Sequence, residues 1–147
     1  MDETPISTAD LVDISAYRHW TPVTLRFSDQ DSIGHVNNVA YAAFAEAGRV
    51  AWGMELIDRS SETDCDFILA SLTIDYLREM HYPGTVEVGT RAVRLGNKSV
   101  TVGQGIFRDG VAVAVARGTI VFIDVANGGT TRVPDGVRTL IDAELNR

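Results

Sequence analysis

Residues 36–57, VNNVAYAAFAEAGRVAWGMELI, decide the fold of this chain. Their apolar side chains recur with the spacing of one helical face, alanine is frequent, and no proline interrupts the stretch. The pattern predicts one long helix whose buried face consists mostly of small side chains, against which a curved sheet can pack closely. We expect this buried face to contain Val36, Ala40, Ala43, Phe44, Ala47, Val50, Ala51 and Met54.

Five strands are predicted around this helix. Apolar and polar side chains alternate before it, and four further apolar segments follow it, joined largely by short turns such as Gly96-Asn97 and Asp109-Gly110. Strands joined by hairpins and packed on one helix indicate an α+β fold with an antiparallel sheet. The predicted strands are residues 19–28, 67–77, 85–95, 99–107 and 111–125.

The length of the chain suits one domain, because 147 residues bury one sizeable core and are too few for two ordinary ones. Residues 1–18 are polar, acidic and weakly patterned, and we interpret them as a loose lead-in. Residues 19–147 then form the single domain, which ends in a short helix from Pro134.

Composition excludes several classes of function. The net charge of −7 argues against nucleic-acid binding, which needs a basic face, and no apolar run is long enough to span a membrane. The acidic start lacks the basic residues of a signal peptide. One cysteine, Cys65, permits no intrachain disulfide and has no ligand-spaced neighbours for zinc. We therefore expect a soluble, cytoplasmic protein without a metal or cofactor.

The densest run of polar residues, Ser28–Asn38, lies between the first strand and the helix. Asp, Ser, Gly and Asn also build ordinary strand-to-helix turns, so a purely structural loop is one interpretation. The other is catalytic: Asp31 supplies a carboxylate, and Asn38 lies at a helix start, where backbone N–H groups can bind an oxyanion. These two groups suffice for thioester hydrolysis, because a thiolate leaves without a dedicated general acid.

A specific set of residues is spread over positions 26–49: Arg26-Phe27-Ser28-Asp29-Gln30-Asp31, Gly34-His35-Val36-Asn37-Asn38, Tyr41, Phe44, Glu46 and Arg49. This set resembles the signature of the hotdog-fold acyl-CoA thioesterases, the 4-hydroxybenzoyl-CoA thioesterase-like family. The resemblance implies a five-stranded antiparallel sheet wrapped around one long central helix, hydrolysis of an acyl-CoA to free acid and CoA, and a homodimer or homotetramer with each active site at a subunit interface.

The same resemblance implies roles for single residues. Asp31 corresponds to the family's catalytic aspartate, as a nucleophile or as a general base on water, and Asn38 supplies a backbone N–H to the thioester carbonyl. His35 and Asn37 hold positions that place the loop or the substrate, with His35 also a catalytic candidate. Glu46 corresponds to a helix carboxylate that is catalytic in other hotdog branches.

Structural interpretations stand beside these roles. Glu46 can pair with Arg49 one turn along the helix, and Asp29 can close the loop by accepting backbone N–H groups. Tyr41 falls opposite the predicted core face, so it can line a substrate pocket or pack at an interface. His35 can be a hydrogen-bonded loop residue.

Positive charge is concentrated between residues 81 and 108, where four basic residues face one acidic residue and give a local charge of +3. The predicted hairpin there carries Arg94, Lys98 and Ser99, and Lys98 is the only lysine of the chain. Such a hairpin can hold the phosphates of coenzyme A, or it can carry ordinary solvated charges.

Two other functions remain open: hydration or dehydration of an acyl thioester, which pairs an Asp with a His, and acyl-thioester binding without turnover. The H-V-N-N sequence at 35–38 resembles branches that act on fatty or short acyl groups more than those that act on 4-hydroxybenzoyl-CoA.

Overall fold

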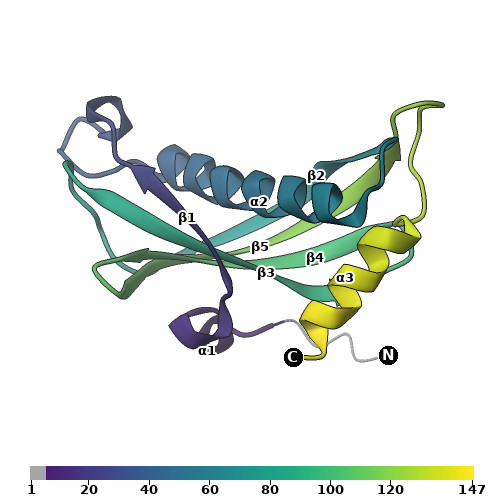
Figure 1. Cartoon of the computed structure of the whole chain (residues 1–147). Helices are drawn as coiled ribbons and strands as arrows, with labels where there is room; N and C mark the ends of the chain where they lie inside the picture. Colours follow the sequence, from purple (N-terminus) through teal and green to yellow (C-terminus); the bar gives the residue numbers. More distant parts are fainter. Residues whose placement is uncertain (1–5) are drawn as a thin grey trace.

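The sheet is five-stranded and antiparallel throughout, with strand order β1-β3-β4-β5-β2. The structure, a computed structural model, describes residues 6–147. A long helix, α2 (Asn38–Ser60), crosses one face of the curved sheet (Figure 1), so the predicted α+β architecture is confirmed. The strands are β1 (His19–Thr24), β2 (Cys65–Tyr76), β3 (Thr85–Leu95), β4 (Ser99–Arg108) and β5 (Val111–Asp124).

The first strand is shorter than predicted. It ends at Thr24, and a single 3-10 turn, η2 (Phe27–Asp29), occupies the end of the segment that alternation assigned to a strand. The cause is Asp29, whose carboxylate accepts the amide of Arg26 at 2.7 Å and turns the chain. Pro22 within β1 has no N–H, which fits its place at an edge of the sheet.

Helix α2 begins two residues later than predicted because Asn37 is its N-cap. The Asn37 side chain accepts the amide of Ala40 at 2.9 Å. Val36 lies outside the helix, and its amide donates to the carbonyl of Met80. At the other end Ser61 adopts the left-handed conformation, with φ of 61°, and terminates the helix.

The buried face of α2 differs from the predicted one. Ala43, Val50 and Met54 are exposed, whereas Gly48 and Gly53 face the sheet. A Cβ atom on Gly48 would lie 2.5 Å from a methyl group of Val88, and one on Gly53 would lie 2.3 Å from the Phe67 ring. Close approach of helix and sheet therefore depends on these two glycines, whereas the sequence pattern indicated that alanine would allow it. The buried helix residues are Ala40, Tyr41, Phe44, Ala45, Gly48, Arg49, Trp52, Gly53 and Leu56.

The predicted loose lead-in is wrong for residues 6–18; residues 1–5 lie outside the described part. Helix α1 (Thr8–Leu11) and the 3-10 turn η1 (Ile14–Ala16) lie on the sheet face opposite α2 (Figure 1). Leu11 is fully buried there, in space that the missing side chain of Gly103 leaves open. The Tyr17 hydroxyl donates to the Leu11 carbonyl at 2.6 Å and fixes the segment.

The C-terminal helix α3 (Asp135–Leu145) confirms the predicted helix after Pro134. Its buried side chains Val137 and Ile141 pack with Trp52 of α2, and the Glu144 carboxylate accepts the Trp52 indole N–H at 3.1 Å. These contacts close the end of the sheet that lies away from the β1–α2 loop.

Candidate active site

The loop between β1 and α2 is organised by a buried carboxylate. Asp29 is 2% exposed and accepts the amide and the guanidinium group of Arg26, the latter at 2.8 Å. Its carbonyl accepts the amide of Asn37 at 2.8 Å, and the amide of Leu25 donates to the carbonyl of Gly84, the residue before β3. The structural interpretation of Asp29 is thereby confirmed.

Asp31 lies exposed at the tip of this loop. One carboxylate oxygen, Oδ1, accepts the amides of Ile33 and His35, each at 3.0 Å. The other oxygen, Oδ2, has no hydrogen-bond partner within residues 6–147. The Asp31 amide donates to the His35 carbonyl at 2.8 Å, and Gly34 takes a φ of +83° to make the reversal. The loop thus holds one oxygen of Asp31 and leaves the other free for chemistry.

The start of α2 presents a backbone donor beside the loop. Asn38 is the first helical residue, is exposed, and its amide has no acceptor in the part of the chain that the structure describes. The Tyr76 hydroxyl donates to the Asn38 carbonyl at 3.2 Å and links this end of the helix to β2. Because the dipole of a 23-residue helix is positive at its start, the free amide favours a negatively charged oxygen.

The His35 side chain contacts the connection between β2 and β3. Its Nε2 lies 3.0 Å from a carboxylate oxygen of Glu79, and its ring stands edge-on to the ring of His81, 5.0 Å between centroids. Sequence reasoning missed Glu79 and His81, which lie in the connection between β2 and β3. The structure brings both to His35 because the Val36 amide donates to Met80 in that connection.

Tyr41 belongs to the core, contrary to its predicted place opposite the core face. It is 3% exposed, and its hydroxyl donates to the carbonyl of Arg78 at 3.2 Å. Burial raises the pKa of the Tyr41 phenol, and Tyr76 and Glu79 nearby add to this effect. Its observed contacts are structural ones.

Glu46 and Arg49 do not form the predicted ion pair within residues 6–147. Glu46 is exposed and lies about 12 Å along the helix axis from Asn38, so the structure does not join it to the Asp31 loop. Arg49 is 3% exposed, its Nη1 has no partner among the described residues, and burial lowers the pKa of its guanidinium group.

The basic hairpin lies at the far end of the sheet. Strand β3 begins beside the Asp31 loop and ends before the turn of the basic hairpin. The Asp31 loop and this turn are therefore about 33 Å apart along the strand. Arg94 and Lys98 are exposed and Ser99 is half-buried, while the turn itself is packed against residues 130–138. Within one chain, Arg94, Lys98 and Ser99 are therefore not part of the Asp31 loop site.

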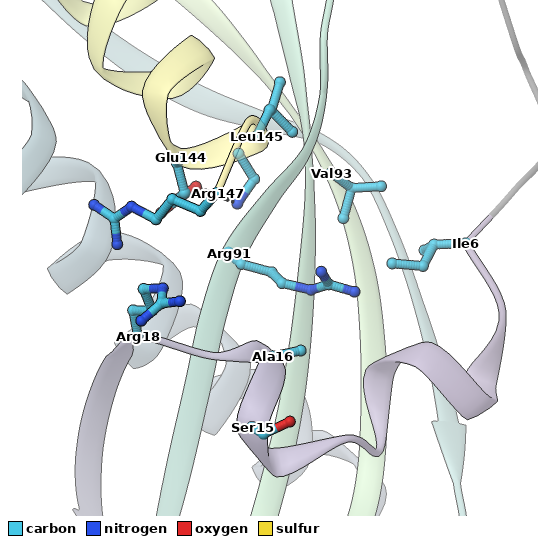
Figure 2. Close-up of a pocket in the computed structure, with 10 residues that line it drawn as sticks. Ile6, Ser15, Ala16, Arg18, Arg91, Val93, Glu144, Leu145 and Arg147 are labelled. Atoms are coloured by element: carbon cyan, nitrogen blue, oxygen red, sulfur yellow. Dashed lines mark hydrogen bonds between the residues drawn. The ribbon is translucent and has the colours of Figure 1, made fainter.

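Two surface hollows differ in their relation to this loop. One, of about 520 Å³, is lined by residues 78–83 and by the β4–β5 turn, and it includes Glu79 and His81. The other, of about 390 Å³, lies between α3 and η1 (Figure 2). Its Glu144 already accepts hydrogen bonds from Trp52 and Ala92. In Figure 2 the guanidinium groups of Arg91 and Arg147 point in different directions. Only the first hollow adjoins the candidate site.

Comparison with known proteins identifies the family. The model of the thioesterase-like superfamily matches residues 25–141, which include the Asp31 loop, α2 and strands β2–β5. The chain belongs to this superfamily. Membership agrees with the hotdog architecture expected from residues 26–49, which is thereby confirmed.

Solved structures of the same architecture agree with this superfamily. The PA5185 protein of Pseudomonas aeruginosa strain PAO1 is 31% identical, with 88% of this chain and 92% of that chain covered and a TM-score of 0.73. A thioesterase of Thermus thermophilus, solved with coenzyme A and zinc, is 27% identical, with 91% and 98% covered and a TM-score of 0.77.

A curated relative matches over a shorter span. The uncharacterised protein YsmA of Bacillus subtilis (strain 168) is 26% identical over 88 residues, which cover 60% of each chain. Among the described helices, none is both long and apolar enough to cross a membrane.

Replacing Asp29 tests the foundation of the loop. Although burial works in the opposite direction, the hydrogen bonds and charge of Arg26 hold the pKa of Asp29 below its ordinary value of 3.8. Its ionised form thus contributes stability above that pH, and the contribution is lost as pH falls through the depressed pKa. Asp29→Asn should lower the free energy of unfolding at pH 7 by about 1–3 kcal/mol.

Urea denaturation of the two proteins between pH 7 and acid pH measures the difference, which should narrow as the pH falls below 3.8. The exposed Asp64→Asn is the control and should leave the curve unchanged. A gap between wild type and Asp29→Asn that is constant with pH would contradict the assignment.

Proposed function

We propose that the protein hydrolyses an acyl-CoA thioester to the free acid and CoA. The observation that carries the proposal is that one short loop ends in two groups without a hydrogen-bond partner among residues 6–147. One is an exposed oxygen of Asp31, and the other is the Asn38 amide at the start of a long helix. Membership of the thioesterase-like superfamily supports it, as does similarity to a Thermus thermophilus thioesterase solved with coenzyme A.

The chemistry needs two groups. Asp31 Oδ2 accepts a proton from water while the water oxygen forms a bond to the thioester carbon. The carbonyl oxygen becomes negative and is held by the Asn38 N–H. Collapse of this intermediate breaks the carbon–sulfur bond and releases the thiolate, whose conjugate thiol has a pKa near 8.5 and so requires no strong acid to leave.

Direct attack by Asp31 is the second route to the same products. Oδ2 then bonds to the acyl carbon, the thiolate leaves, and water hydrolyses the resulting anhydride. Both routes use the free oxygen and the same amide. The acyl group that the H-V-N-N branch implies is fatty or short, and superfamily membership favours hydrolysis over the hydration chemistry of related folds.

Asp31→Asn separates chemistry from loop structure. The asparagine carbonyl can still accept the amides of Ile33 and His35, so the loop is preserved while the reactive oxygen is lost. We expect kcat to fall at least about 100-fold on the best acyl-CoA, with the melting temperature unchanged. The assay follows thiol release with a chromogenic reagent over acyl-CoAs of graded chain length.

Asp31→Ala is the control for the loop, because it loses both hydrogen bonds and should also lower the melting temperature. Turnover by Asp31→Asn at the wild-type rate would exclude the mechanism. If no acyl-CoA or acyl-carrier thioester is cleaved by the wild type, binding without turnover becomes the better account.

Asn38→Pro tests the oxyanion donor. Proline removes the N–H and suits the first position of a helix, and Asn37, at φ −76° and ψ 159°, already has the extended conformation that a following proline requires. We expect kcat to fall about 10²- to 10³-fold with little change in melting temperature. Asn38→Ala keeps the amide and should retain most activity; equal losses in both variants would assign the role to the side chain.

A dimer through the free edge of β2 completes this proposal. No strand within residues 6–147 pairs with the outer edge of β2, and exposed apolar side chains of β2 and α2 lie beside it, including Ile68, Leu69, Val50 and Met54. Pairing β2 with a second copy would satisfy its backbone groups and cover this surface. In such an assembly, Arg94, Lys98 and Ser99 of one subunit would contact the CoA bound at the Asp31 loop of another subunit.

Met54→Glu should break this dimer, because it places a charge in the apolar contact. Met54 is 62% exposed in the single chain, so the monomer should fold normally. We expect the dimer dissociation constant to rise at least about tenfold, measured by analytical ultracentrifugation against a subunit mass of 16.0 kDa. Ile14→Glu, at an exposed apolar residue of η1, is the matched control; dissociation by that variant alone would place the interface elsewhere.

A further inference from the structure

We infer that His35, Glu79 and His81 bind a divalent transition-metal ion. The first residue lies in the loop before α2, and the other two lie in the connection between β2 and β3. They include two of the three histidines of the chain. The inference concerns binding and does not depend on the proposed hydrolysis.

The three side chains already converge. Nε2 of His35 lies 3.0 Å from Glu79 Oε2, and Nε2 of His81 lies 4.0 Å from Glu79 Oε1. All three ligand atoms lie within 4.8 Å of one another. An ion about 2.1 Å from each ligand would place them roughly 3–3.5 Å apart. The side chains of Glu79 and His81 are 64% and 58% exposed, so small rotations close this gap without disturbing the core.

The other ring nitrogen of His81 indicates which atom is available to a metal. Nδ1 lies 3.1 Å from the carbonyl oxygen of Gly34, which can only accept, so Nδ1 carries the hydrogen. Nε2, which lies 4.0 Å from Glu79 Oε1, is then the ring nitrogen that can offer a lone pair to a metal ion. A metal ion placed between this nitrogen and the Glu79 carboxylate would be bound by both groups. A hydrogen bond from the second nitrogen to a carbonyl is also typical of histidines that bind metals.

The donor set selects the class of ion. Two imidazoles and one carboxylate suit Zn²⁺, Co²⁺ or Ni²⁺, whereas Mg²⁺ and Ca²⁺ prefer oxygen ligands. Three protein ligands leave further positions for water, and the 520 Å³ hollow that Glu79 and His81 line provides the space. Arg108 also lines the hollow, but its guanidinium group is occupied by the carbonyls of His81 and Pro83.

Occupancy would connect two segments that form the candidate site. The His35 amide donates to Asp31 Oδ1, so an ion on the His35 ring ties the Asp31 loop to the connection before β3. An ion would thus restrain the position of Asp31 while leaving its Oδ2 atom free.

Calorimetric titration of the untagged protein with zinc chloride tests the inference. We expect one ion per chain, and visible absorption bands when Co²⁺ replaces Zn²⁺. Glu79→Gln and His81→Ala should each weaken zinc binding by more than about tenfold, since even the loss of a partner behind a ligand costs about 10–100-fold. Thermal melting should show stabilisation by zinc in the wild type and much less in both variants.

His19→Ala is the matched control. His19 forms a similar pair with a carboxylate, its Nε2 lying 3.1 Å from Glu55, but no third ligand joins that pair among the described residues. It should bind zinc as the wild type does. Absence of zinc binding by the wild type, or equal losses in all three variants, would overturn the inference. Circular dichroism confirms folding, and Glu79→Gln, close in shape to glutamate, serves if His81→Ala is unstable.

The result is separable from the proposed function. Zinc binding needs no substrate, so a chain that binds zinc and cleaves no thioester retains this site and loses only the hydrolysis. If the protein cleaves acyl-CoA but binds no zinc, the proposed hydrolysis stands and the metal site is overturned.

Discussion

The hydrogen bonds of Asp29 are the constraint on which the site depends. Its carboxylate turns the chain after β1 by accepting from Arg26, and its carbonyl accepts the Asn37 amide just before the helix. The end of the strand and the start of the helix are therefore fixed by one buried residue. The hydrogen bond between Asp29 and Asn37 closes the loop that contains Asp31 and ends next to Asn38, so both residues are held by the same anchor without a direct bond between them.

A second constraint is the close approach of α2 to the sheet. Gly48 and Gly53 bring the helix backbone against Val88 and Phe67, so the axis of the helix is held at a fixed height over the strands. The first turn of the helix is then placed beside β2, where Tyr76 contacts the Asn38 carbonyl. The packing of the middle of the helix thus positions the amide at its end.

The sequence predicted the elements well because their signals are local. Alternation and turn residues predicted the observed bounds of β3, and Pro134 predicted the start of the last helix. The face of α2 was misassigned because Val50 and Met54 continue the apolar period although the sheet does not cover them. Periodicity shows that a side chain is apolar and says nothing of which surface covers it.

The candidate site was predictable only where its residues are neighbours in sequence. Asp31, His35 and Asn38 share one loop, and residues 26–49 carry the family signature. Glu79 and His81 reach His35 from more than forty positions away, through one backbone hydrogen bond between Val36 and Met80, and no spacing rule connects them. Likewise, only the three-dimensional structure shows that the basic hairpin and the Asp31 loop lie at opposite ends of the sheet.

The two edges of the sheet are chemically unequal. Strand β2 offers twelve residues for pairing, whereas β1 is six residues long and contains Pro22, which has no N–H to give to an added strand. Growth of the sheet by strand addition is therefore favoured on one side only. Two copies joined at β2 would present β1 at both outer margins, so edge-to-edge assembly would stop at a closed pair and would not continue into a fibre.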